Sequence, residues 1–86
     1  MPKISTFYGI IIFMYFDDHN PPHFHAEYNG NSVMIKINDL SVLQGSMPSR
    51  ALGMIVEWAY QHRDELVTNW ERMTKGEVFN KIDPLK

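Results

Sequence analysis

The residues of this sequence best able to do chemistry lie in one segment, HNPPHFHAEY, at positions 19–28. Three of the chain's four histidines fall within it, at His19, His23 and His25, and Glu27 follows. Neutral imidazole is the commonest metal ligand in proteins, and zinc also accepts carboxylate oxygens. The segment is therefore the leading candidate for a binding site, with a divalent metal as one candidate ligand.

The spacing of His23 and His25 suits a pair of metal ligands. Two histidines at positions i and i+2 of a strand share one face, with Cα atoms about 7 Å apart, so their rings are able to converge on one zinc ion. The residues that could supply a third ligand are His19, Asp17, Asp18 and Glu27. Three protein ligands and one open position are what hydrolytic zinc requires, which makes a metal-dependent hydrolase or nuclease one hypothesis.

Two other interpretations need no metal, and no cofactor is expected under either. In the first, His23 and His25 are partly exposed strand residues that hydrogen-bond to carboxylates or turn carbonyls, and Pro21–Pro22 fixes a sharp corner. In the second, this corner is a contact surface, because a stiff turn loses little entropy on binding. The candidate contact residues are Asp17, Asp18, His19, His23 and His25, and the candidate metal ligands are His19, His23, His25 and Glu27.

Other catalytic chemistry finds less support. His62 and Glu65 stand at i, i+3 spacing, which can supply two ligands in helical metal sites, although an exposed hydrogen-bonded pair is the simpler explanation. The absence of cysteine excludes disulfides, thiolate zinc sites and a cysteine nucleophile. The sequence has no Gly-rich phosphate loop, and no serine or threonine has a base at a predictable spacing.

Hydrophobic patterning predicts the strands that position these residues. The run from Phe7 to Phe16 is apolar on both alternating sets, which predicts one strand covered on both faces. Residues 23–28 alternate as a second strand, and Asn29–Gly30 is a strong hairpin signal leading into a third strand at residues 33–37. Residues 40–43 form a short fourth strand or edge segment.

A long helix is predicted after Pro48, which suits a first helical turn, and Gly76 is a natural stop. Apolar residues recur at three- and four-residue steps, at Leu52, Ile55, Val56, Ala59, Leu66, Val67, Trp70 and Met73. Arg63 falls within this stripe, so the helix is kinked near residues 61–64 or the guanidinium is paired there. An unbroken helix would be about 42 Å long and would overhang the sheet.

The expected fold is a single α+β domain over residues 1–86, with a three- to four-stranded antiparallel meander packed on one long C-terminal helix. The apolar overhang of that helix and the two-faced first strand exceed what one such chain can bury, which predicts a homodimer. Val78, Phe79 and Ile82 are the residues that could instead fold back and cover the overhang.

Composition narrows the choice of partner. Apolar residues at 44% and charged residues at 21% are ordinary for a globular protein. A net charge of −2 leaves no excess of basic residues to bind phosphate groups. Nucleic acid is therefore a less favoured partner, although it is not excluded. The longest apolar run has about ten residues, against ~20 for a membrane helix, so we expect no membrane span and a cytoplasmic protein.

With these segments placed, the chain resembles the small bacterial proteins known as domain of unknown function 4160. The residues that carry the resemblance are Pro2-Lys3-Ile4, Phe7-Tyr8-Gly9-Ile10, Met14-Tyr15, Asp18-His19, Pro21-Pro22-His23-Phe24-His25, Gly45, Pro48, Glu57-Trp58, His62, Glu65-Leu66, Trp70 and Ile82-Asp83-Pro84-Leu85. They extend nearly end to end, and the DHNPPHFH segment is the specific part. Ala26 departs from the family pattern, where a larger, valine-like residue is expected.

The resemblance implies a biological context rather than a chemistry. Such proteins look like members of two-gene modules of the toxin–antitoxin type, beside another small uncharacterised domain. The implied partner is a protein encoded nearby, and the implied function is protein binding. That function is favoured here over the hydrolase or nuclease alternative.

Overall fold

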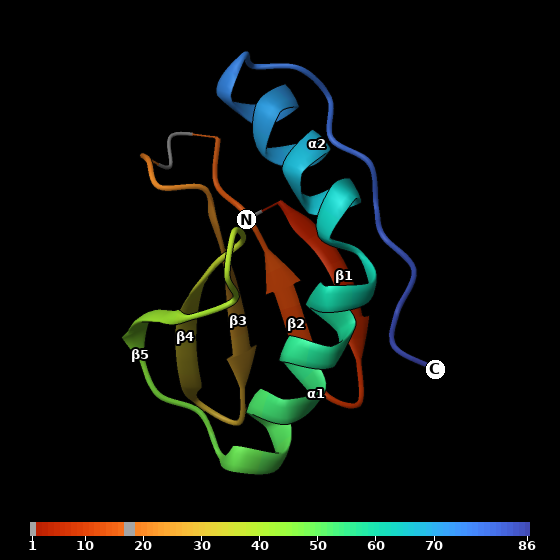
Figure 1. The fold of residues 1–86 in the computed structure, drawn as a ribbon. Coiled ribbons are helices and arrows are strands. Elements are labelled where there is room, and N and C mark those ends of the chain that lie inside the picture. Colours follow the sequence, from red (N-terminus) through yellow and green to blue (C-terminus); the bar gives the residue numbers. More distant parts are fainter. Residues whose placement is uncertain (1, 17–18) are drawn as a thin grey trace.

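The computed structural model describes residues 2–16 and 19–86. These residues contain five strands and two helices (Figure 1). They are β1 (Lys3–Phe7), β2 (Ile10–Phe13), β3 (His23–Tyr28), β4 (Asn31–Lys36), β5 (Val42–Gly45), α1 (Ser49–Gln61) and α2 (Arg63–Thr74). The strands form one antiparallel sheet in the order β1-β2-β3-β4-β5. The α+β class and the meander are confirmed, with five strands instead of three or four and two helices instead of one.

The first hairpin divides the apolar run that was predicted to form one strand. Tyr8 and Gly9 have φ values of 49° and 81° and form the turn between β1 and β2. Positive φ at both central residues is the geometry of a type I′ hairpin turn. The prediction of one strand from Phe7 to Phe16 is therefore wrong, because Phe7 ends β1 and pairs with Ile10. Tyrosine is uncommon at positive φ, so the hydrophobic pattern of the run did not predict a turn at Tyr8.

The second hairpin is the predicted one. Asn29 and Gly30 have φ values of 48° and 80° and connect β3 to β4. In β3, Phe24 and Ala26 are buried and Glu27 is exposed, as the alternating pattern predicted. This alternation directs one set of side chains toward the helices and leaves the other on the opposite face of the sheet.

The edge strand β5 begins two residues later than its predicted segment. It pairs with β4, and all four of its residues are exposed. Gly45 is required at its end, since its φ is +86° and a Cβ there would lie 2.3 Å from the backbone oxygen of Ser32. The backbones of β5 and β4 therefore approach too closely at this point to admit a side chain.

The predicted long helix is broken at His62, so the kinked alternative is confirmed. His62 has φ −119° and ψ 24°, and its N–H donates to the carbonyls of Trp58 and Ala59 at 3.1 and 3.2 Å. Its own carbonyl accepts from the N–H of Leu66 at 3.0 Å, which begins α2. The Arg63 guanidinium carbon lies 5.6 Å from the centre of the Tyr60 ring, a cation–π arrangement.

The hydrophobic core lies between the sheet and the two helices. Figure 1 shows α1 crossing one face of the sheet while α2 continues past the end of the strands. The core side chains are Ile4, Phe7, Ile10, Ile12, Met14, Phe24, Ala26, Val33, Ile35, Ile37, Ala51, Ile55, Trp58, Ala59, Leu66, Trp70, Met73 and Ile82. The expectation of cover on both faces of the first strand is met only in part, because α1 covers one face, and on the other Phe13 is buried against Tyr15 and His25.

The predicted apolar overhang is largely covered by the chain itself. Of the predicted apolar residues in the second half of the helical segment, Leu66, Trp70 and Met73 are buried and Val67 is exposed. After α2, residues 77–86, here named the tail, run back along the helices toward β1 (Figure 1). Ile82 is buried in the core, as the fold-back alternative anticipated. Among the described residues, neither helix has the length and apolar character needed to cross a membrane.

Candidate functional site

His23 is a buried residue at the start of β3 and not an open ligand position. Its side chain is 4% exposed, and its Nδ1 donates a hydrogen bond to the Pro21 carbonyl at 2.8 Å. A carbonyl oxygen can only accept, so this bond places the ring proton on Nδ1. The Trp70 ring lies against the imidazole, with centroids 5.3 Å apart. The peptide bond between Asn20 and Pro21 is cis, and the Pro22 carbonyl accepts from Ile37 at 3.0 Å.

His25 lies on the face of the sheet opposite α1 and is half-buried. Its ring stacks on Phe13 of the neighbouring strand, with centroids 5.5 Å apart and planes inclined by 6°. Tyr15 meets the same imidazole edge-on, with centroids 4.7 Å apart. The ring of His23 lies 5.1 Å from that of His25. The histidine motif therefore continues directly into an aromatic cluster.

The strand register extends this cluster into a surface, here named the open face. Phe13 pairs with His25, His25 with Met34, and Met34 with Gln44, so their side chains form one row across four strands. The next row is Ile11, Glu27 and Ser32. A hollow of about 260 Å³ lies over these rows and is lined by Phe13, Tyr15, His25, Glu27, Ser32, Val33, Met34, Gln44 and Gly45.

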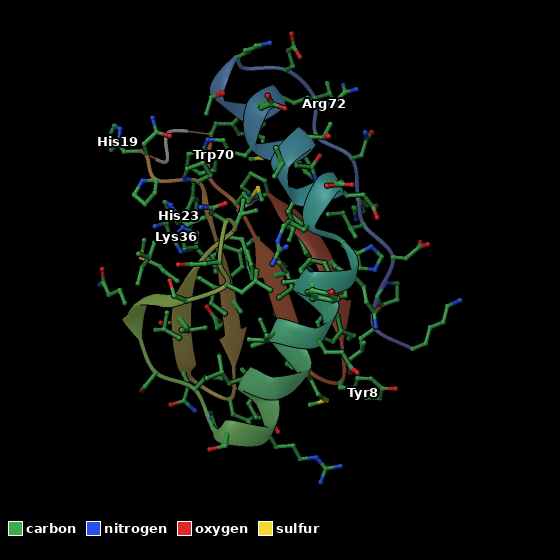
Figure 2. All side chains as sticks on the ribbon, viewed as in Figure 1. Tyr8, His19, His23, Lys36, Trp70 and Arg72 are labelled. Carbon is green, nitrogen blue, oxygen red and sulfur yellow. The ribbon has the colours of Figure 1, made fainter. Side chains whose placement is uncertain are left out.

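The candidate metal ligands do not converge among the described residues. His19 is exposed, and Figure 2 shows it on the outer side of its loop, away from His23. No group of three histidine, aspartate or glutamate side chains within residues 2–16 and 19–86 is arranged to hold a metal ion. The predicted set of His19, His23, His25 and Glu27 is therefore not assembled, because the corner points His19 outward and the fold buries His23. Asp17 and Asp18 lie outside the described residues.

The second histidine–carboxylate pair is the simple hydrogen-bonded pair that the spacing suggested. His62 Nδ1 and Glu65 Oε1 are 2.6 Å apart at the break between the helices. The His62 ring also lies 5.6 Å from the ring of Trp58. These contacts hold the break in place and bring no third ligand.

Sequence reasoning missed the residues that complete the open face. Phe13, which is itself buried, and the half-buried Tyr15 alternate with Ile12 and Met14 of the core, but assigning one strand to the whole run left the role of each face undefined. The signal that would have found them is the alternation of Phe13 and Tyr15 combined with the pairing of Phe13 with His25. That pairing follows from the register of two strands separated by the corner, which local pattern does not specify.

A protein-family model described as "Domain of unknown function (DUF4160)" matches residues 9–71. The chain belongs to this family. The DUF4160 match begins just before β2 and ends within α2, so it contains the histidine motif and the residues of the open face. No curated protein and no solved structure matches the chain.

Proposed function

We propose that this DUF4160 chain is a protein-interaction domain whose partner binds the open face, with His25 at its centre. The observation that carries the proposal is the pair of half-buried neighbours His25 and Met34 on the face of the sheet opposite α1, with the His25 ring stacked on the buried Phe13 ring. Aromatic and methionine side chains are enriched in the cores of protein interfaces.

The apolar side chains of α2 offer no comparable surface, because Leu66, Trp70 and Met73 are buried within the chain. The open face also contains Glu27 and Gln44, which suits an interface that combines polar and apolar side chains. No observation on residues 2–16 and 19–86 favours the hydrolase alternative.

The partner in this proposal is a protein encoded beside this one, in a two-gene module of the toxin–antitoxin type within the cytoplasm. This part of the proposal rests on the family resemblance, since DUF4160 is a family of unknown function. The net charge of −2 supports a protein partner over nucleic acid.

The test is a calorimetric titration of the purified chain with the product of the adjacent gene. We expect His25→Ala to weaken binding about tenfold or more, as removal of a central interface residue does. His25→Phe keeps a ring stacked on Phe13 and loses both nitrogens, so it reports which part of the side chain the partner contacts. His62→Ala is the matched control, because His62 lies on the helices, and it should leave affinity unchanged.

Two results would contradict the proposal. One is undetectable binding of the adjacent gene product by the unaltered, folded chain. The other is unchanged affinity in His25→Ala, provided that thermal melts show the variant to be folded. Equal losses in His25→Ala and His62→Ala would mean that the effect is general and does not come from the open face.

A further inference from the structure

The tail is held as a bound peptide would be, through its backbone. Asn69 Nδ2 donates to the Asn80 carbonyl at 2.7 Å, and the Asn80 N–H donates back to Asn69 Oδ1 at 2.9 Å. Trp58 Nε1 donates to the Asp83 carbonyl at 2.8 Å, and the Ile82 N–H donates to the Ile4 carbonyl at 3.0 Å. Ile4, Trp58 and Asn69 thus form a groove, here named the tail groove, that recognises an extended main chain.

The apolar residues of the tail recur with a period of three. Ile82 is buried, Phe79 and Leu85 are partly buried against the core, and the residues between them are exposed. No helix or strand is present in residues 77–86. A period of three without internal hydrogen bonds is typical of extended peptide ligands of the polyproline type, which dock on aromatic side chains.

The side chains of the tail groove are buried when the tail is bound. The Asn69 side chain is 1% exposed and Trp58 is fully buried, so both are covered in the closed chain. Removing the tail would take away the hydrogen-bond partners of the Trp58 Nε1, the Ile4 carbonyl and the Asn69 amide. An occupant with the same backbone and the same three apolar side chains restores every one of these contacts.

A single turn sets whether the tail reaches its own groove. Gly76 has φ +72°, its N–H donates to the Met73 carbonyl at 3.1 Å, and the Glu77 N–H donates to the Arg72 carbonyl at 2.8 Å. This is a Schellman motif, which reverses the chain at the end of α2. Val78 beyond it is 79% exposed, so the turn itself buries little. If the turn straightens, α2 directs the tail away from its own groove.

We propose that the tail groove also accepts the tail of a second copy, so that two chains exchange tails across a two-fold axis and form a homodimer. The second copy is the occupant that fits, because its tail reproduces all four backbone hydrogen bonds and the buried Ile82 without a new contact. Exchange of an identical element is a low-cost route to a dimer. Gly76 is the switch between the closed monomer and the exchanged dimer.

The test straightens this turn in the full-length chain and measures mass by light scattering. Gly76→Val opposes the positive φ, and the added Cβ meets no atom within 4 Å. We expect Gly76→Val to move from the monomer mass to the dimer mass as its concentration rises toward about 1 mM, a range typical of short-tether effective concentrations. Gly53→Val, at a helical glycine with equally open surroundings, should stay monomeric.

Further variants show whether the dimer uses the tail groove. Asn69→Ala added to Gly76→Val should return the chain to monomer, whereas Asn80→Ala should not, because Asn80 is held by its backbone. A Gly76→Val chain that stays monomeric up to about 1 mM, or a dimer that survives Asn69→Ala, overturns the proposal. If the valine variant loses its helical circular dichroism, Gly76→Ala replaces it, and the same two results decide.

Discussion

His23 and Trp70 pack ring against ring, with centroids 5.3 Å apart and planes inclined by 52°, although 46 positions separate them in the sequence. The contact joins the first strand residue after the double-proline corner to the helix that extends past the sheet. His23 therefore packs in the core, whereas His19 and His25 do not.

We predict that His23→Ala lowers the free energy of unfolding by about 2 kcal/mol, because it removes a buried ring and its hydrogen bond to Pro21. His19→Ala should change the same quantity by less than about 0.5 kcal/mol, since His19 is exposed. Urea denaturation of both variants measures the difference. Equal values for the two would show that the packing against Trp70 contributes nothing.

Metal removal should leave the fold intact. Among the described residues no three ligands converge, and the core consists of apolar side chains packed between the sheet and the helices. We therefore expect a chelator to move the melting temperature by less than about 2 °C. A fall in melting temperature of about 10 °C or more, reversed by added zinc, would instead identify a structural metal. The histidines would then again be candidate ligands.

Two glycines with similar φ should respond differently to alanine. Gly45 and Gly30 have φ values of +86° and +80°, so alanine is strained at both, by about 1 kcal/mol each. At Gly45 the added Cβ also meets the Ser32 oxygen at 2.3 Å, whereas at Gly30 nothing lies within 4 Å. Gly45→Ala should therefore destabilise the chain clearly more in thermal melts. Equal losses at the two positions would mean that β5 shifts without cost.

The turn before β5 predicts a pH effect at Asp39. The Ser41 hydroxyl and then the Ser41 N–H donate to its carboxylate, at 2.7 and 3.1 Å, and lower the pKa of Asp39. A lowered pKa in the folded state means that the turn contributes stability above the ordinary aspartate pKa, and this contribution is lost as pH falls through the lowered value. Ser41→Ala should raise the pKa of Asp39 part of the way back.

Carboxyl-carbon NMR titration checks this prediction directly. Ser41→Thr is the matched control, because it keeps the hydroxyl and should keep the pKa of Asp39 low. An unchanged pKa in Ser41→Ala would assign the effect to the backbone N–H and the neighbouring Lys36 charge instead.

Local pattern was sufficient for much of the fold. Asn29–Gly30 predicted its hairpin, because both residues tolerate the positive φ that the turn needs. Alternation in residues 23–28 placed Phe24 and Ala26 on the buried face, and the stop at Gly76 marked the end of the helical segment. Each of these features depends on residues a few positions apart, so the sequence by itself determined them.

Other features depend on contacts between distant residues, and only the tertiary structure decided them. The Tyr8–Gly9 turn carries no strong local signal, and its position is tied to the pairing of β1 with β2. The tail covers α2 because Asn69, Trp58 and Ile4 bind its backbone, which hydrophobic periodicity does not report. His19, His23 and His25 share one short segment, yet the corner exposes the first, Trp70 buries the second, and stacking on Phe13 places the third on the open face. Spacing in sequence determined which residues were candidates; strand register and long-range packing decided which of them meet.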